Sequence, residues 1–455
     1  MIEKNGFFGG VTATSGHVIQ AYNNPVLRAS GVLDDTAAAF FEFLKDMALG
    51  QSNVSFLQHI AYTSLNTFNW LVNMGVRFAN VPHNSWDGWP VHRAVAWREP
   101  LILGDGSFLT IAMVKHAEQK GITLIKNLRA ESLIQKGAPG TAVTGVVARD
   151  RFGGTVTINA DAVILATGGY SQNFDLISVF SPALLEAGFF PPTGPTVSPW
   201  GRGGQVLSFV TGDGHIMGME AGAGTVKGAL MVGISGQRNH AVFVTPRGVR
   251  FTDEAFTYLT ATASPMWILG YHYHWSVWGT NTNPATPVAG ALSAPSLEEL
   301  ADAMGLVGAD KAAFVNEINQ YNSKVWNPAG QGSIIPNGYR NLNFYRAPYS
   351  LNGQARHQPV LGPTYFAVRT GPGQHHTNWW ISRGGLKINI DGKVLTGAGS
   401  VIPGLFAAGE VANGDTLPAQ YGGSGMALTV YANMARRVGW VAAGETWPPP
   451  GVRVP

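Results

Sequence analysis

The stretch from Gly404 to Leu428 constrains the fold of this chain more than any other. Its first part, Leu405–Ala408, predicts a buried strand that ends at Gly409-Glu410. After a polar loop, the glycine-rich turn Tyr421–Gly425 opens an apolar helix that reaches Met434. Glycines at a helix N-terminus let a flat or anionic ligand approach the backbone N–H groups. A carboxylate directly after a strand is typical of a clamp for sugar-like hydroxyls. The stretch therefore predicts a ligand site between a strand end and a helix start.

The composition favours a compact enzyme with a cofactor. The chain has 455 residues, of which 58 are glycine, 45% are hydrophobic and 13% are charged. Such a chain can bury large cores and is unlike disordered chains. The net charge is +3 without a basic run or an acidic tail, so no nucleic-acid partner is expected. The absence of cysteine excludes disulfides and cysteine-bound metal. Without a run of 18 apolar residues or a signal peptide, we expect a cytoplasmic protein with no transmembrane segment.

The N-terminus predicts the end of a dinucleotide-binding strand. Met1–Lys4 resembles the tail of a buried strand with Glu3 at its end, and Gly6, Gly9 and Gly10 follow. In a dinucleotide fold this acidic residue comes after a strand, a G-x-G-x-x-G turn and a helix. We therefore expect that one βα unit of roughly 30 residues is missing before Met1.

Hydrophobic periodicity and turn residues predict mixed helices and strands. We expect helices over Val54–Met74, Ser107–Gly121, Gln205–Val210, Leu297–Ala303 and Lys311–Val325, one capped by Asp34–Thr36 that reaches Met47, and one opened by Thr211–Gly214. Strands are expected over Ile122–Ile125, over an antiparallel meander of Ala130–Ile134, Val143–Arg149 and Thr155–Ile158, over the fully apolar run Ala162–Ala166 as a buried strand, and in hairpins within Val242–Phe251 and Gly385–Leu395. Between about Lys227 and Pro372 the sequence is aromatic and irregular, which indicates an inserted domain.

In this order the motifs resemble the fumarate reductase/3-ketosteroid dehydrogenase class of FAD-dependent oxidoreductases. The matching segments are Glu3-Lys4, Gly9–Gly16, Ala166–Gly169, Thr211–Gly214, Gly384–Leu386 and Pro403–Glu410. The resemblance covers essentially the whole chain and implies an α/β fold. Residues 1–226 and 373–455 would form a discontinuous, Rossmann-like FAD-binding domain that lacks its first βα unit. Residues 227–372 would form an inserted α+β capping and catalytic domain.

The resemblance also implies the residues that bind FAD. Glu3 would hold the adenosine ribose, Glu410 the ribityl chain, and Ser424–Leu428 the edge of the isoalloxazine ring. The other expected cofactor residues are Ala130, Thr167 and Gly168 on the adenine and pyrophosphate side, together with Lys4, Gly9, Gly10, Thr12, Thr14, Ser15, Gly16, Ala166, Asp213, Gly409, Ser424 and Leu428. Members with covalently bound flavin carry a histidine where this chain has Val11, so FAD is expected to be non-covalent.

The residues that would face the substrate separate two branches of this class. Fumarate and succinate enzymes clamp two carboxylates with arginines, which bind them in a bidentate way. In this chain no arginine follows Arg250 before Ala263, and Gln420 takes the place of the second arginine. Ketosteroid dehydrogenases instead carry a tyrosine four residues after a glutamate and a Tyr-x-x-x-Gly turn. Tyr258 and the pair Tyr421 and Gly425 match this second pattern.

The expected reaction is therefore the dehydrogenation of a ketone at its α,β carbons, on a bulky apolar or steroid-like substrate. The resemblance implies that Tyr258 takes the α-proton, that the Tyr421 hydroxyl and the Gly425 N–H bind the carbonyl oxygen, and that FAD N5 takes the hydride. A small-molecule substrate and an external electron acceptor are the expected partners.

Two alternatives stay open. His375 and His376 lie where dicarboxylate enzymes carry a substrate-binding histidine, so an enoate reductase of the fumarate reductase type is one. The other is a fragment that does not bind FAD. Histidines also occur at His272 and His274, but no carboxylate pair lies near them in the sequence, so no metal site is expected.

Overall fold

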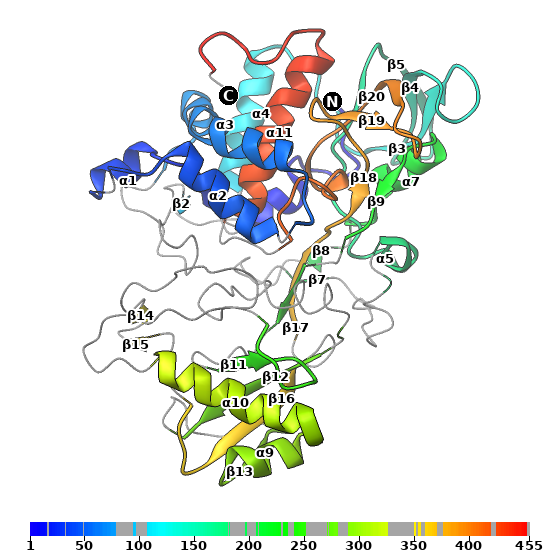
Figure 1. Cartoon of the computed structure of the whole chain (residues 1–455). Coiled ribbons are helices and arrows are strands. Elements are labelled where there is room, and N and C mark those ends of the chain that lie inside the picture. The colour runs from blue at the N-terminus through cyan, green and yellow to red at the C-terminus, as the bar shows by residue number, and fades with distance from the viewer. Residues whose placement is uncertain are drawn as a thin grey trace. The chain divides into compact units, whose positions relative to one another are not determined.

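The chain folds into two compact units. The computed structural model (Figure 1) describes residues 1–15, 18–31, 33–48, 50–78, 94–96, 107–180, 182, 196–197, 206–207, 209–228, 231–234, 241–251, 271, 273–280, 290–325, 350–351, 354–355, 360–370, 376–419 and 425–452. Unit 1 comprises Met1–Leu185, Phe190–Met231 and Asn378–Pro455. Unit 2 comprises Glu186–Phe189 and Val232–Thr377.

The described strands of unit 1 form several short sheets. β20 (Val401–Ala407) pairs in parallel with β6 (Val163–Leu165) and antiparallel with β19 (Lys393–Leu395). The backbone N–H of Ala408 donates to the carbonyl of Leu165, which fixes the two strand ends next to each other. The carboxyl ends of β6 and β20 therefore lie at the same edge of this sheet.

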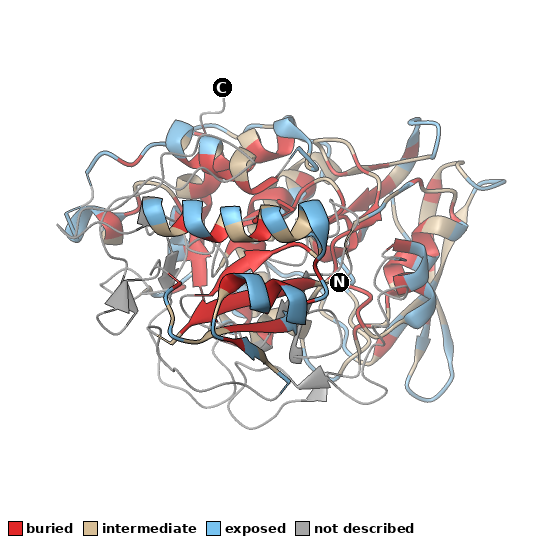
Figure 2. Cartoon of the chain, turned by 60° about the horizontal axis from the view of Figure 1, so that its bottom comes forward, coloured by how far each residue is buried: buried red, intermediate tan, exposed pale blue. Residues whose placement is uncertain are grey.

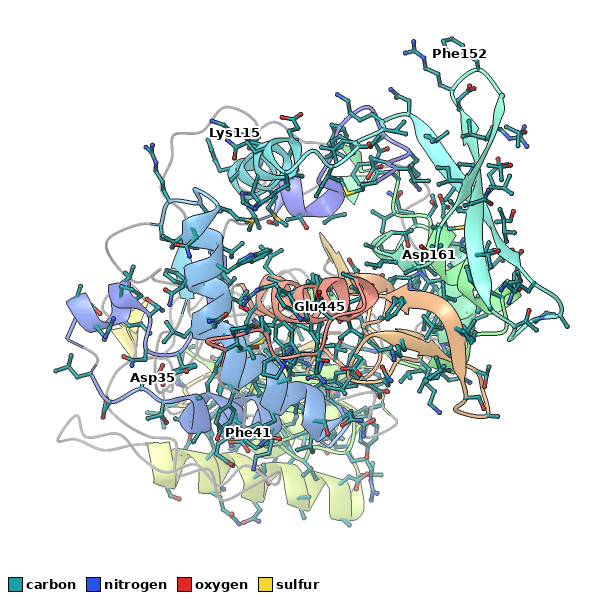
Figure 3. The ribbon with its side chains drawn as sticks, turned by 90° about the horizontal axis from the view of Figure 1, so that it is seen from above. Asp35, Phe41, Lys115, Phe152, Asp161 and Glu445 are labelled. Atoms are coloured by element: carbon teal, nitrogen blue, oxygen red, sulfur yellow. The ribbon has the colours of Figure 1, made fainter. Side chains whose placement is uncertain are left out.

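The expected antiparallel meander is confirmed. It consists of β3 (Leu128–Gln135), β4 (Val143–Asp150) and β5 (Thr155–Asn159), in that order. In the central strand, Ala148 lies between Ala130 of β3 and Val156 of β5. Figure 3 shows Phe152 at the tip of the β4–β5 hairpin, where its side chain is 82% exposed.

Helices α2 (Ala37–Ala48), α3 (Val54–Asn73) and α11 (Met426–Ala442) pack side by side (Figure 1). Their starts follow the local sequence. The Thr36 hydroxyl accepts from the N–H of Ala39, and the Asn53 side chain accepts from the N–H of Ser55, as N-cap residues do. All three helices are where the periodicity predicts them, because each buries one apolar face against its neighbour.

The described part of unit 1 contains one further helix of more than ten residues, α4, and several shorter elements. They are η1 (Gly10–Thr14), β1 (Val18–Gln20), α1 (Pro25–Ala29), β2 (Ala94–Ala96), α4 (Ser107–Gln119), α5 (Phe174–Phe180), β7 (Thr196–Val197), β8 (Val206–Leu207), α7 (Asp213–Glu220), β9 (Thr225–Val226), β18 (Gly385–Leu386) and η2 (Gly409–Val411). β10 (Met231–Ile234) and β17 (His376–Ile381) lie where the chain passes from one unit to the other. The expected strand at Ile122–Ile125 is reduced to one parallel bridge between Ile2 and Ile125.

Two expectations about local structure are wrong. Within the helix expected over Gln205–Val210, Val206 and Leu207 instead form a strand that pairs with β7 in an antiparallel ladder. A short apolar run is compatible with the period of a helix and with that of a strand, and here the pairing with β7 makes it a strand. The run Ala162–Ala166 does contain β6, but it is not fully buried. Ile164 is 41% exposed, since β6 is the edge strand of its sheet among the described residues and only the Leu165 side enters the core.

Unit 2 is built on a four-stranded antiparallel sheet. Its strands are β11 (Val242–Val244), β12 (His274–Gly279), β16 (Tyr365–Thr370) and β13 (Leu292–Ala294), in that order. Helices α9 (Leu297–Ala303) and α10 (Gly308–Val325) cover the sheet through residues such as Leu300 and Phe314, and β14 (Ser350–Leu351) pairs with β15 (Gln354–Ala355). Figure 2 shows the buried strands in red behind helices with exposed outer faces.

The aromatic residues of unit 2 are core residues where the structure describes them. Trp275 and Trp278 of β12 are both buried. His274 is also buried, with its ring edge-on to Phe243 and Phe251. Burial lowers the pKa of His274 to about 3, so the ring is neutral. This environment is that of a packed core histidine.

Candidate cofactor site

Asp213, in the first turn of α7, binds side chains that are far apart in the sequence. Its carboxylate forms an ion pair with the Lys4 ammonium at 3.0 Å and accepts hydrogen bonds from Arg129 and from the Thr211 hydroxyl. Lys4 also donates to Thr211 Oγ1 at 2.7 Å. Burial raises the pKa of Asp213, but the hydrogen bonds from Arg129, Thr211 and Lys4 outweigh it, so the pKa lies below its usual value. The structure thus brings together two expected cofactor residues, Lys4 and Asp213.

Glu3 lies at the strand-like end of the first segment. Its N–H donates to Ile125, and its carbonyl accepts from Leu128, so the backbone of Glu3 is held by the chain that enters β3. Its carboxylate accepts from the N–H of Asn5 at 2.8 Å. The expected adenine contact, Ala130, lies in β3 two residues after Leu128. The two expected adenosine-side residues are therefore joined through one short stretch of backbone.

The glycine loop after Glu3 packs against α4 through Gly9 and Thr110. A Cβ at Gly9 would come within 2.6 Å of the Thr110 side chain, which explains why glycine is needed there. The loop continues through Gly10 into η1, and the carbonyl of Thr12 accepts from both the N–H and the hydroxyl of Ser15. This segment presents backbone rather than long side chains.

A second glycine turn follows β6. Gly168 has a left-handed φ of 78° and no atom within 4 Å of the position of an added Cβ. Gly169 is tightly packed, since a Cβ there would lie 2.4 Å from Glu410 Oε1. Thr167 packs on α7 through Gly214, where an added Cβ would come 2.1 Å from the Thr167 hydroxyl. One face of this turn therefore touches Glu410, while Ala166 and Thr167 stay exposed.

Glu410 is a buried carboxylate at the end of β20. It accepts a hydrogen bond from the backbone N–H of Ser382 at 2.5 Å, and the Ser382 hydroxyl lies beside it, since a Cβ added at Gly169 would lie 2.4 Å from both oxygens. Burial raises the pKa of Glu410 to about 7, although the Ser382 hydrogen bonds favour its ionised form. The Ser382 hydroxyl also accepts from the N–H of Tyr170, which follows the Gly168-Gly169 turn. Sequence reasoning missed Ser382, whose one signal is its place just before Gly384-Gly385.

The N-terminus of α11 is fixed against β1. Its N-cap residue, Gly425, has a left-handed φ of 86°, and a Cβ there would lie 2.7 Å from the backbone of Val18. The Thr429 hydroxyl accepts from the N–H of Gln20 at 2.7 Å. Leu428 packs against the core that includes Ile19. The first N–H groups of a helix have no acceptor within the helix and carry a partial positive charge, so this end can face an electron-rich ligand.

Several expected site residues lie outside the described residues. They are Gly16, Tyr258, His375, Tyr421 and Ser424, together with the side chains of Thr14 and His376. Their roles stay predictions. Among the described residues no cluster of three or more His, Cys, Asp or Glu side chains suits a metal ion, and none of the described helices has the length and apolar character needed to span a membrane.

The residues present fit a dinucleotide with a flat ring. Gly168 and Gly409 are left-handed glycines with open space where a side chain would be, so a ligand can approach their backbone. Glu410 supplies a carboxylate for hydroxyl groups, and the start of α11 supplies N–H groups for a polar ring edge. All of these lie in unit 1.

Comparison with known proteins identifies relatives that match most of this chain. Relatives include a fumarate reductase (cytochrome) from Shewanella frigidimarina, 26% identical over 433 residues, and a urocanate reductase from Eggerthella lenta, 26% identical over 447 residues. These matches cover 91% and 90% of this chain, but 67% and 65% of the relatives. The chain thus spans about two thirds of the length of these proteins.

Among solved structures, the 3-ketosteroid-Δ4-(5α)-dehydrogenase from Rhodococcus jostii RHA1 has a similar fold. The TM-score is 0.68 at 22% identity, and the match covers 97% of this chain and 91% of that chain. At this identity the similarity concerns the α/β fold alone. A family model described as an FAD binding domain matches residues 1–426. The chain belongs to this FAD-binding family, and FAD is its cofactor.

Proposed function

We propose that this chain desaturates a ketone at its α,β carbons, and that its substrate is bulky and apolar, such as a steroid. It is an FAD-dependent oxidoreductase that acts on CH–CH groups. Fumarate reductase, urocanate reductase and ketosteroid dehydrogenase activities all interconvert a carbon–carbon single and double bond beside an electron-withdrawing group. The choice of a ketone rests on the residues of this chain.

The start of α11 carries this proposal. In the desaturation of a ketone, the carbonyl oxygen gains negative charge as the α-proton leaves, and hydrogen-bond donors fixed around it lower the barrier. Gly425 is the N-cap of a 17-residue helix, and its left-handed backbone is pressed against β1. The helix N-terminus adds a partial positive charge at the same place. A single oxygen fits such a site without any arginine.

Each residue has a separate role in the proposed reaction. Tyr421 donates a hydroxyl hydrogen bond to the substrate oxygen beside the Gly425 N–H. Tyr258 removes the α-proton, and because a free tyrosine has a pKa near 10, a neighbouring group must favour its ionised form. Glu410 would bind FAD hydroxyl groups, and with Val11 in place of a histidine the FAD would be non-covalent. When bound, FAD supplies N5 as the hydride acceptor. An external acceptor then reoxidises the cofactor.

The buried arginines of the described residues favour a neutral substrate. Arg383 donates to the carbonyl of Leu417 at 3.3 Å and to that of Gln51 at 3.0 Å, so its guanidinium holds backbone. Arg250, the one arginine of its segment, is buried with its guanidinium over the ring of Tyr321. A dicarboxylate needs paired cations that face the substrate. Arg383 instead binds backbone carbonyls of unit 1, and Arg250 stacks on Tyr321 of unit 2.

The second candidate function is the reduction of an enoate such as fumarate or an aryl acrylate. Its support is the 26% identity to a fumarate reductase and a urocanate reductase, together with the adjacent pair His375-His376. A histidine pair can bind one carboxylate when at least one ring is charged. The first function oxidises its substrate and the second reduces it, so each needs its own assay.

The test compares Tyr421→Phe with the wild type, using the full-length protein loaded with FAD. Oxidation of a panel of 3-ketosteroids and cyclic ketones is followed with an artificial electron acceptor. Loss of one donor to the developing oxyanion should lower kcat/KM by about 10²–10³-fold. Tyr62→Phe, which removes a hydroxyl from α3 where Tyr62 packs edge-on against Phe41, is the matched control and should change little.

The enoate function is tested in the same preparation. The enzyme is reduced under anaerobic conditions, and its reoxidation by fumarate, by aryl acrylates and by enones is compared. Reoxidation by enones, with ketone turnover that depends on Tyr421, supports the proposal. Reoxidation by enoates alone, or ketone turnover that Tyr421→Phe leaves unchanged, would refute it.

A further inference from the structure

Ser382 connects three segments that are far apart in the sequence. It is fully buried between β17 and the Gly384-Gly385 pair. Its backbone N–H donates to Glu410, and its hydroxyl accepts from the N–H of Tyr170. The hydroxyl also lies beside the Glu410 carboxylate, since a Cβ added at Gly169 would lie 2.4 Å from both Ser382 Oγ and Glu410 Oε1. Its carbonyl accepts from the Asn413 side chain at 2.7 Å. Every polar group of this serine is therefore used.

The contacts of Ser382 concern the two glycine-lined parts of the cofactor site. Tyr170 is the residue after the Gly168-Gly169 turn, and Glu410 follows the open position Gly409. The Ser382 hydroxyl lies between them and can accept from one while it donates to the other, because a hydroxyl has both functions. One side chain thus sets the distance between the turn after β6 and the carboxylate after β20.

We propose that Ser382 is a positioning residue for FAD binding, acting through Glu410. Its backbone N–H, which donates to Glu410, and its hydroxyl, which lies beside the carboxylate, hold that group next to the Gly168-Gly169 turn in the geometry that accepts ligand hydroxyls. The inference rests on the proposed role of Glu410 as an FAD ligand and is independent of the substrate. Ser382 itself need not touch the cofactor.

The physical reason is the cost of a buried carboxylate. Without donors, a buried carboxylate loses ionisation or turns toward solvent. A carboxylate that is fixed in place binds without a further loss of side-chain freedom, which strengthens binding. The serine backbone N–H survives any substitution at this position, whereas the hydroxyl does not. Removing the hydroxyl therefore frees the carboxylate to rotate about one remaining hydrogen bond.

The experiment measures the Kd of FAD for the full chain, by titrating FAD-free protein and following flavin fluorescence. Hydrogen bonds to charged groups are worth enough that Ser382→Ala should raise the Kd about tenfold to a hundredfold. Ser382→Thr keeps the hydroxyl and should restore most of this loss. Ser64→Ala removes a buried serine hydroxyl from α3, away from Glu410, and should leave the Kd within about twofold.

A double-mutant cycle shows whether Ser382 acts through Glu410. In the Glu410→Ala background, Ser382→Ala should change the Kd by less than about twofold, because the group it positions is gone. The same factor in both backgrounds would refute the proposal, as would an unchanged Kd in Ser382→Ala alone. If Ser382→Ala does not fold, Ser382→Cys serves in the same cycle, since a thiol is a weaker donor of similar shape.

These readouts do not depend on which substrate is turned over. Failure of the ketone assay with an intact Ser382–Glu410 coupling would overturn the proposed reaction and leave this inference standing. Additive Kd changes with normal ketone turnover would overturn this inference and leave the proposed reaction standing. Urea unfolding of the FAD-free variants shows that each compared protein is folded.

Discussion

Replacing Gly169 with alanine tests the packing between the turn after β6 and Glu410. The added Cβ would lie 2.4 Å from both Glu410 Oε1 and Ser382 Oγ, and 2.6 Å from Glu410 Cδ. Contacts below 3.0 Å force the neighbours to move. The adjacent Gly168 is a matched control, because a Cβ there meets no atom within 4 Å and adds only the strain of its left-handed backbone.

The magnitude follows from what must move. Glu410 cannot retreat without losing its hydrogen bond from the Ser382 N–H, and a hydrogen bond to a charged group is worth about 1.5–3 kcal/mol. Overpacking a dense region adds about 1–3 kcal/mol. We therefore expect Gly169→Ala to lower the free energy of unfolding by about 3–5 kcal/mol. Left-handed strain at Gly168→Ala costs about 1–2 kcal/mol.

The assay is urea unfolding of the full chain without FAD, followed by circular dichroism at pH 7.5. The order of stability should be wild type, then Gly168→Ala, then Gly169→Ala. FAD titration of the same proteins should show the largest rise in Kd for Gly169→Ala, because it displaces Glu410. If Gly169→Ala unfolds within about 1 kcal/mol of the wild type, or is more stable than Gly168→Ala, the packing described for this turn is wrong.

Two further predictions concern other parts of unit 1. Gly425→Ala should cost about 2–4 kcal/mol in urea unfolding, because φ is 86° and the new Cβ would lie 2.7 Å from the Val18 backbone; a neutral effect would contradict the close contact of α11 with β1. Burial lowers the pKa of His215 to about 3, against about 6.5 when unfolded, so its stabilising contribution is complete above pH 6.5 and is lost as the pH falls. His215→Phe should reduce the loss of unfolding free energy between pH 6.5 and 4 by up to about 1.4 kcal/mol per pH unit, and an unchanged slope would show that His215 is not buried as described.

Local sequence was sufficient for most helices and for the meander. The capping residues Thr36 and Asn53 mark the starts of α2 and α3, because their side chains accept from N–H groups two or three residues ahead. Polar and apolar residues alternate over β3, β4 and β5, and short turns join these strands, so the sequence predicts that neighbouring strands pair antiparallel. These features depend on interactions between residues close in the sequence.

The candidate site was predictable in its outline. Glu410 follows a strand, and Gly425 opens a helix, so both could be placed from the motif order alone. Lys4 and Asp213 were both expected near the cofactor, but their ion pair joins residues at two distant positions of the chain, and no local pattern encodes it. The catalytic roles of Tyr258 and Tyr421 stay predictions.

The sequence by itself determined the family, the cofactor and the order of elements, because glycine turns, caps and periodicity act over a few residues. Tertiary structure decided which neighbours those elements meet. It made Val206-Leu207 a strand by supplying β7 as a partner, and it left Ile164 exposed at a sheet edge. It also placed Ser382 between the Gly168-Gly169 turn and Glu410. Burial there removes water, so losing a hydrogen bond to the carboxylate costs more free energy than it would at the surface.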